Sequence, residues 1–246
     1  MCTLTYRLTE QGYQLFFNRD ENKLRSQAIP PTVNSSLKAI YPIDPNGGGT
    51  WIAVHESGVS LALLNYYQAQ VDPNLNIFTS RGVIIPRLLE NVNNIHEYLM
   101  KMDFRHFQAF QLCVFANKLS AKQSKSELAW QYTWDGKKLT YVTLSAEYSL
   151  PLTSSGVDYE NVYASRKQQF KKMITGQQTT TADYIAYHQH QGPSGKCSVK
   201  MYREDAQTVS FTMIDVDQKQ PLGDKIKLQY IDYLTPQPNA TLSLHL

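Results

Sequence analysis

Alternating apolar and polar positions predict β-strands along most of the chain. Residues 3–8 alternate, residues 13–17 are rich in aromatic side chains, and the segment between them ends in Gly12. Two such strands joined by a short turn are typical of a β-hairpin. Asp135-Gly136 predicts a second tight hairpin turn. The other strands that the pattern predicts are 51–55, 59–65, 106–115, 128–134, 139–144, 147–152, 198–203, 208–215 and 225–233.

Apolar residues recur at helical spacing in three other segments. These are 80–102, where Pro86 breaks or starts one piece, 157–175 and 181–190. Residues 22–50 contain several prolines and a run of three glycines, so we expect a long loop there. The order of elements suits an α+β fold, in which two antiparallel sheets pack face to face with helices outside. A chain of 246 residues without repeats or a low-complexity linker is expected to form one domain, 1–246.

Composition excludes several functional classes. A net charge of +3 without a basic stripe argues against nucleic acid as a partner. No apolar run is long enough to span a bilayer, and the N-terminal residues lack the apolar region of a signal peptide. The three cysteines have no paired spacing, which predicts no disulfide and a reducing, cytoplasmic location. Cys113 lies in an apolar run and is expected in the core.

Cys2 follows the start methionine directly. Methionine is normally removed before a small residue, which would leave a thiol and a free α-amine on one residue. An N-terminal nucleophile activated by its own amine is a known catalytic arrangement. The unperturbed amine titrates near ~7.7–8.0 and the thiol near ~8.5, so both are poised close to neutral pH. The alternative is an inert cysteine near a chain end.

The predicted hairpin places charged residues beside Cys2. If the strands pair about this turn, the residue numbers of each cross-strand pair add up to ~21–23. Cys2 is then opposite the segment from Arg19 to Glu21. An arginine beside a thiol lowers its pKa, and Asp20 would be able to orient the α-amine. Neighbouring strand residues point to opposite faces, so Arg19 and Asp20 reach the same thiol only through a bulge. The alternative is a solvated charge cluster at a strand end.

The first 70 residues contain several short motifs, which are Met1-Cys2, Asn18-Arg19-Asp20-Glu21, Gly48-Gly49-Thr50-Trp51-Ile52-Ala53-Val54, Gly58 and Leu63-Leu64-Asn65-Tyr66. Together they resemble the NRDE family, which includes transport and Golgi organisation protein 2. Residues 203–211 also resemble a segment of bacterial members. The family is similar in turn to N-terminal nucleophile hydrolases of the choloylglycine hydrolase and penicillin acylase type. That likeness implies an αββα sandwich and cleavage of linear amides.

The resemblance implies a catalytic set of Cys2, Arg19, Asp20 and Asn65. Three departures from the hydrolase pattern are visible. Arg19 and Asp20 are adjacent, whereas those hydrolases separate the two residues. A serine, Ser155, also stands where a second asparagine would help to bind the oxyanion, and Lys196 is the nearest residue to a later arginine that the chain lacks.

Several other residues are weaker candidates. Asn18, Trp51 and Tyr66 are candidates for oxyanion or substrate contacts, although aromatic residues at strand ends commonly serve packing. Tyr67 belongs with the aromatic candidates, and Arg81 and Lys196 are candidates for contact with an anionic ligand. His188 and His190 could offer a metal two imidazoles from a strand, but no third ligand is apparent, and we expect no metal.

Two functions follow as hypotheses. The first is amide hydrolysis or acyl transfer on a small-molecule substrate, with Cys2 as nucleophile, Asn65 and a backbone N–H stabilising the oxyanion, and no cofactor. The second rests on the resemblance to eukaryotic family members. It is a non-catalytic intracellular binding or trafficking protein for haem or a lipid-related ligand, with Cys2 as a soft ligand.

Overall fold

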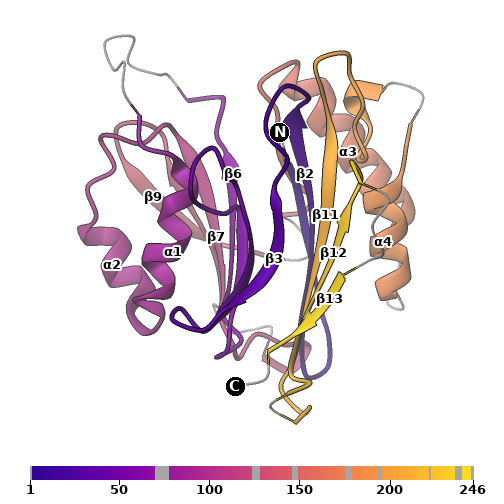
Figure 1. Ribbon diagram of the computed structural model, residues 1–246. Coiled ribbons are helices and arrows are strands. Elements are labelled where there is room, and N and C mark those ends of the chain that lie inside the picture. Colours follow the sequence, from indigo (N-terminus) through magenta and orange to yellow (C-terminus); the bar gives the residue numbers. More distant parts are fainter. Residues whose placement is uncertain are drawn as a thin grey trace.

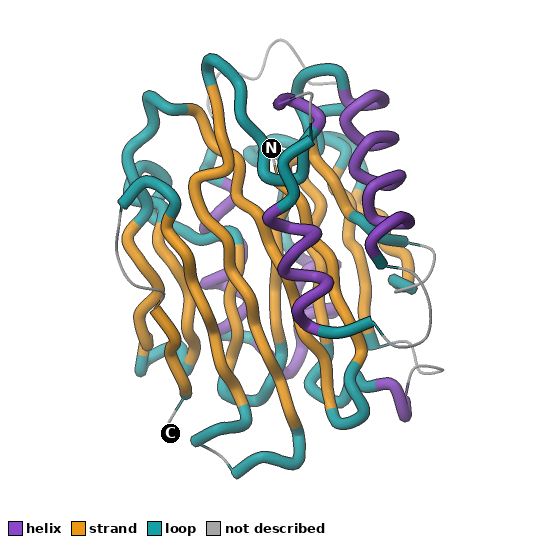
Figure 2. Tube along the Cα trace, turned by 90° about the vertical axis from the view of Figure 1, so that its right-hand side faces the viewer, coloured by secondary structure: helices purple, strands orange, loops and turns teal. Residues whose placement is uncertain are grey.

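Two antiparallel sheets lie face to face, and helices cover the outer face of each (Figure 1). The structure is a computed structural model that describes residues 2–69, 78–123, 128–145, 149–174, 179–192, 195–221, 223–235 and 240–244. Figure 2 looks onto the helices that lie at the right of Figure 1 and shows them crossing the strands beneath. The predicted α+β sandwich is therefore confirmed.

The first sheet has the N-terminal hairpin at its centre. Its six strands are, in spatial order, β10 (Leu152–Ser154), β1 (Cys2–Leu8), β2 (Gly12–Asn22), β11 (Ala206–Asp217), β12 (Ile226–Asp232) and β13 (Ala240–Ser243). The helices α3 (Tyr159–Met173) and α4 (Thr181–Gln189) cover its outer face (Figure 1). A short 3-10 turn, η4 (Gly195–Cys197), contacts α3. The strands β1 and β2 are therefore covered by the second sheet on one side and by helices on the other.

The second sheet has seven strands. They are, in spatial order, β3 (Ile29–Asn34), β4 (Ala39–Ile43), β5 (Ile52–His55), β6 (Ser60–Asn65), β7 (Phe110–Phe115), β8 (Ala129–Trp134) and β9 (Leu139–Thr143). Its outer helices are α1 (Ile84–Leu89) and α2 (Ile95–Lys101), preceded by the 3-10 turns η1 (Arg81–Val83) and η2 (Val92–Asn94), and η3 (Ala121–Gln123) follows β7. The predicted helical segment 80–102 is thus confirmed in pieces, with Pro86 in the first turn of α1.

Alternation along β2 places one set of side chains in the core between the sheets. Tyr13, Leu15 and Phe17 are fully buried there. The Tyr13 hydroxyl lies 2.7 Å from the carbonyl oxygen of Gly58 and 2.8 Å from Ser60 Oγ, which links the two sheets. Each buried aromatic ring removes roughly 150–250 Å² from water, so this face holds the sandwich together mainly through apolar burial.

The loop predicted over residues 22–50 was wrong in part, because the segment contains the strands β3 and β4. Pro30 and Pro31 lie inside β3. Proline lacks an N–H donor and is confined to edge strands, and β3 is an edge of its sheet. The prolines therefore indicated an edge strand as much as a loop.

The strand predicted over 198–203 is absent, and Tyr202 makes an isolated bridge to Gln207 instead. The backbone groups of this segment bond to scattered partners and not to one neighbouring strand. The Lys200 N–H donates to the carbonyl oxygen of His190 at 3.0 Å, and the Met201 N–H donates to Thr208 Oγ1 at 2.7 Å. The strand predicted over 147–152 is also displaced. Part of it lies outside the described residues, and the observed β10 begins at Leu152.

A buried polar layer joins the helices to the first sheet. The guanidinium of Arg166 on α3 is fully buried and lies 3.1 Å from Asp20 Oδ2. It also donates to Thr3 Oγ1 at 2.5 Å and to the carbonyl oxygen of Ser198 at 3.1 Å. Thr208 Oγ1 donates to the other carboxylate oxygen of Asp20 at 2.6 Å. One arginine thus ties α3 to the adjacent strands β1 and β2, and through Asp20 to β11.

In the part of the chain that the structure describes, no helix combines the length and apolarity needed to cross a membrane.

Replacing Arg166 with methionine should destabilise the protein by about 3–5 kcal/mol, because Asp20 would remain buried without its counter-charge. Chemical denaturation followed by tryptophan fluorescence measures the change. The exposed Lys171 on the same helix provides the control, and Lys171→Met should change stability by less than about 0.5 kcal/mol. Equal effects of the two substitutions would contradict the importance of the buried pair.

Candidate functional site

The register of β1 places Cys2 between two neighbours. Cys2 lies directly opposite Arg19 on β2, as the turn predicted, and opposite Ser154 on β10. Directly opposed residues of antiparallel strands project from the same face of a sheet. The three side chains therefore share the inner face, toward the second sheet.

A cavity of about 540 Å³ opens at this end of the sandwich. Its walls include Cys2 and Arg19 from the first sheet, Trp51 and Asn65 from the second, and Arg81 from the η1 turn. The two sheets thus bring together residues that are far apart in the sequence, and the thiol of Cys2 lies at a space large enough for a small molecule.

The charge of Arg19 is compensated within the site. Its guanidinium lies over the Trp51 ring at 4.2 Å from the ring centroid, and its Nη2 donates to Glu21 Oε2 at 3.1 Å. Only 5% of Arg19 is exposed. Trp51, which was a candidate for substrate contact, therefore supports the arginine as well as lining the cavity.

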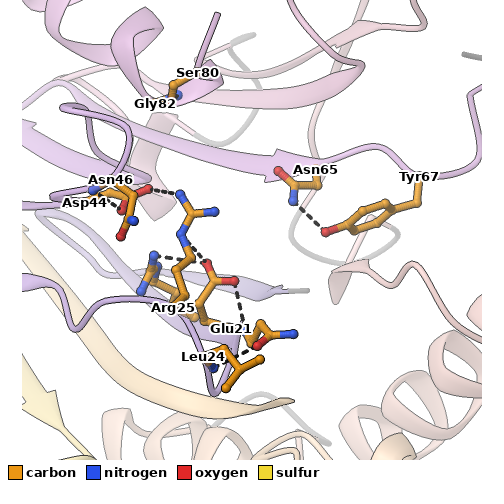
Figure 3. A network of polar contacts seen from close by, with 11 residues as sticks. Glu21, Leu24, Arg25, Asp44, Asn46, Asn65, Tyr67, Ser80 and Gly82 are labelled. Carbon is orange, nitrogen blue, oxygen red and sulfur yellow. Dashed lines mark hydrogen bonds and ion pairs between the residues drawn. The ribbon is translucent and has the colours of Figure 1, made fainter. Parts of the chain in front are cut away.

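A chain of ion pairs forms one rim of the cavity (Figure 3). Arg25 Nε lies 3.6 Å from Glu21 Oε2, and Arg25 Nη2 lies 2.6 Å from Asp44 Oδ2. Asp44 Oδ1 also accepts from the Asn46 backbone N–H at 3.2 Å. Glu21, the last residue of the Asn-Arg-Asp-Glu motif, therefore forms ion pairs with two arginines and belongs to the site.

Asn65 ends β6 and donates from Nδ2 to the Tyr67 hydroxyl at 2.7 Å (Figure 3). Burial raises the pKa of Tyr67, so its phenol remains protonated near neutral pH. A primary amide carries two N–H donors, and this bond uses one of them. Asn65 thus presents a polar donor group at the cavity wall.

The thiol of Cys2 is not activated in the resting protein. Burial raises its pKa, and the negative charge of Asp20 adds to the effect. The positive charge of the chain N-terminus, a hydrogen bond from the Asp20 backbone and the Arg19 charge act in the opposite direction and do not compensate. Arg19 therefore lowers the pKa of this thiol as expected, but the loss of water around the thiol, which the sequence did not reveal, outweighs the effect.

Asp20 borders the cavity, but its carboxylate lies on the other face of the first sheet. Its carboxylate lies in the helix-side layer with Arg166 and Thr208, as strict alternation along β2 requires. The irregularity in the pairing lies on β11, between Thr208 and Ser210, and leaves the alternation of β2 intact. The bulge that would have aimed Arg19 and Asp20 at one thiol is therefore absent from β2.

Two candidates lie elsewhere in the fold. Asn18 is fully buried on the helix side, and its Nδ2 donates to the carbonyl oxygens of His188 and Val199. Tyr66 follows β6, and its backbone N–H donates to the carbonyl oxygen of Ala109 at 3.1 Å. Neither is among the residues that line the cavity, whereas the neighbouring Tyr67 is.

Ser155 and Lys196 are also directed elsewhere. The Ser155 hydroxyl donates to the carbonyl oxygen of Val157 at 2.5 Å. Lys196 forms an ion pair with Asp158 at 2.7 Å at the surface. The serine that the structure places opposite Cys2 is Ser154, which the sequence analysis missed because the boundaries of its strand were predicted too early.

The two candidate metal-binding histidines do not form a metal site. His188 is buried on α4, and its Nε2 lies 2.8 Å from Thr5 Oγ1. Burial lowers the pKa of His188 to about 3, and the nearby Arg166 charge adds to this shift. His190 lies at the end of the helix. No group of three or more His, Cys, Asp and Glu side chains among the described residues could hold a metal ion.

The family follows from a comparison of the whole chain. Residues 1–231 match the family model described as Transport and Golgi organisation 2. The chain belongs to this family. The resemblance seen in the first 70 residues is therefore confirmed. A search of curated proteins finds no match to the chain.

Solved structures of an amidase orthologue, an acylase and a hydrolase share the fold of this Transport and Golgi organisation 2 family member. An N-acylethanolamine-hydrolysing acid amidase orthologue from Caenorhabditis elegans has 11% identity and a TM-score of 0.58, over 89% of this chain and 94% of that chain. Penicillin V acylase from Agrobacterium tumefaciens has 12% identity and a TM-score of 0.55, over 99% of this chain and 86% of that chain. A mutant conjugated bile acid hydrolase from Clostridium perfringens has 12% identity and a TM-score of 0.52, over 99% of this chain and 92% of that chain. At these identities the likeness establishes the N-terminal nucleophile hydrolase-like fold.

Alkylation of Cys2 by iodoacetamide should be slow at pH 7 and should accelerate about tenfold per pH unit up to pH 9. Its raised pKa leaves little thiolate at neutral pH, and only the thiolate reacts. Peptide mapping of timed samples measures the rate, and intact mass reports whether Met1 has been removed. Cys113, which is fully buried, serves as the internal control and should stay unlabelled in the folded protein. A rate already independent of pH at pH 7 would contradict the raised pKa.

Proposed function

We propose that this protein hydrolyses a linear amide, or transfers its acyl group, with Cys2 as the nucleophile. The observation that carries the proposal is the position of Cys2, which lies on the inner face opposite Arg19 and lines the cavity together with Asn65. The structural likeness to amidases and acylases supports the same reaction class. The substrate is a small molecule that fits the cavity of about 540 Å³.

The mechanism requires removal of Met1, which frees the α-amine of Cys2. The raised pKa of the thiol means that it needs a base, and an α-amine with a pKa near ~7.7–8.0 supplies one. As the amine takes the proton, the sulfur attacks the amide carbonyl carbon. The C–N bond then breaks, and the amine returns the proton to the leaving nitrogen. Water cleaves the resulting thioester and releases the carboxylic acid.

Asn65 is the proposed oxyanion donor. The oxygen of the tetrahedral intermediate gains charge as the sulfur adds, and a fixed amide N–H at the cavity wall stabilises that charge. The bond to Tyr67 restrains the Asn65 side chain, which reduces the reorganisation needed during the reaction. Arg19, neutralised in part by Glu21, contributes positive potential at the thiol.

We assign Asp20 a positioning role. Arg166 and Thr208 bind its carboxylate, and Arg166 also binds Thr3, the neighbour of Cys2 in β1. This network holds the end of β1 in place. Asp20 therefore sets the location of the nucleophile through the strands it connects.

The rival hypothesis of haem binding has less support. The cavity walls carry ionised side chains that include Arg19, Glu21, Arg25 and Asp44, whereas a porphyrin needs broad apolar walls. Metal ligation also needs the thiolate form, which the raised pKa of Cys2 disfavours. The residues present do not fit haem. Binding of another ligand without chemistry is the outcome that the experiments below separate from catalysis.

For an amide that the wild-type protein hydrolyses, Asn65→Ala should lower kcat by about 10²–10³-fold. The free energy of unfolding should change by less than about 1 kcal/mol. Tyr67→Phe removes only the hydroxyl that holds Asn65 and is the matched control, with an expected loss of less than about tenfold. Steady-state kinetics and thermal unfolding supply both measurements. A large loss of stability with unchanged kcat would show that Asn65 is structural.

A variant with an uncleaved residue ahead of Cys2 should lose acyl transfer by about 10²–10⁴-fold, because an amide nitrogen cannot accept the thiol proton. Initial rates on a panel of acyl amides, with both proteins checked by intact mass, measure the effect. Cys2→Ala with normal Met1 processing is the control for background hydrolysis. Full activity in the extended protein would exclude an N-terminal nucleophile, and inactivity of both proteins with equal ligand binding would favour the non-catalytic hypothesis.

A further inference from the structure

Arg81 differs from the other arginines that line the cavity. Arg19 is paired with Glu21, and Arg25 is paired with both Glu21 and Asp44. Within the described part of the chain, no carboxylate lies within 4.0 Å of the Arg81 guanidinium, whose Nη1 donates only to the carbonyl oxygen of Ala109, at 3.1 Å. A neutral backbone oxygen does not balance the charge of this side chain.

Arg81 lies in the wall of the cavity in which we propose that the reaction occurs. It is the first residue of η1 and lines the same cavity as Cys2. Its charge interacts with Cys2 and Tyr67. Burial lowers the pKa of Arg81, which means that the guanidinium has lost part of its hydration without gaining an anion. The positive charge of Arg25 also lowers the pKa of Arg81, and the negative charge of Glu21 raises it by a smaller amount.

The remaining charges of the cavity wall balance one another. Glu21 and Asp44 neutralise the two paired arginines, and Asp20 is neutralised by Arg166 from behind the sheet. Arg81 therefore leaves one uncompensated positive charge. A ligand with a single negative charge completes the balance, and a carboxylate matches the planar, two-pronged donor geometry of a guanidinium.

We propose that Arg81 binds a carboxylate of the substrate, so that the preferred substrates are amides carrying a carboxylate near the scissile bond, such as N-acyl amino acids. The inference rests on the proposed function for the scissile bond and on the cavity charges for the carboxylate. Cys2 and Arg81 line the same cavity, so a substrate with its amide carbonyl at Cys2 can direct a carboxylate toward Arg81. The carboxylate belongs either to the leaving amine or to the acyl group, and the probes below separate these two sources.

Paired probes test the inference by binding, independently of turnover. N-butanoylglycine is compared with N-butanoylethanolamine, and the N-ethyl monoamide of succinic acid is compared with N-ethylbutanamide. Isothermal titration calorimetry on wild-type protein should show tighter binding of the acid in one of the two pairs by about 10–100-fold, the range for a hydrogen bond to a charged group. The pair that responds identifies the side of the amide that carries the carboxylate.

Variants assign the preference to Arg81. Arg81→Gln should abolish the difference between acid and neutral probe, and Arg81→Lys should retain part of it because the charge remains. Arg87→Gln, an exposed arginine on α1, is the matched control and should leave the preference unchanged. Thermal unfolding confirms that each variant is folded.

The outcomes separate this inference from the proposed function. Carboxylate preference in binding that depends on Arg81, without turnover of any probe, would support the inference and count against amide hydrolysis. Turnover without any preference for the acids would support hydrolysis and overturn the role of Arg81. Equal preference in wild type and Arg81→Gln, or no measurable binding of either acid, would also overturn it.

Discussion

Arg166 and Asp20 form an ion pair that is completely buried between α3 and the first sheet, with 3.1 Å between the guanidinium and the carboxylate. Such a pair is maintained only when both partners and their remaining hydrogen-bonding groups are satisfied, since either charge alone would be strongly unfavourable there. Arg166 meets this condition with Thr3 and Ser198, and Asp20 meets it with Thr208. The pair therefore fixes the helix and three strands relative to one another at the end of the sheet that carries Cys2.

The two faces of β2 explain why four consecutive polar residues occur in a buried strand. Asn18 and Asp20 point to the helices, where they bind backbone carbonyls and Arg166. Arg19 and Glu21 point toward the other sheet and line the cavity. A strand alternates with a period of two, so one tetrapeptide supplies the structural layer and the cavity wall at once. Changing either pair would disturb a different part of the protein.

Burial and charge pairing define the chemistry of the cavity. Most of its ionised side chains are matched within the wall, which keeps them charged despite partial burial. The Cys2 thiol, by contrast, is held in its uncharged form, because burial raises its pKa more than Arg19 lowers it. A site of this kind holds a neutral nucleophile until a base takes its proton. This requirement is what connects the buried thiol to the α-amine in the proposed mechanism.

Local sequence determined the N-terminal hairpin and set Cys2 opposite the segment from Arg19 to Glu21, because a short turn restricts the strand register; the structure fixes the partner as Arg19. It also determined the alternating faces of β2 and the helical character of most of the segments that became α1 to α4. Tertiary structure alone decided that Arg166 on α3 pairs with Asp20 from a strand far away in the chain. It also decided that β3 accepts two prolines as an edge, that Ser154 faces Cys2, and that the thiol is partly withdrawn from water. These features depend on contacts between distant segments and on the loss of water around each group, and neither is encoded in the spacing of neighbouring residues.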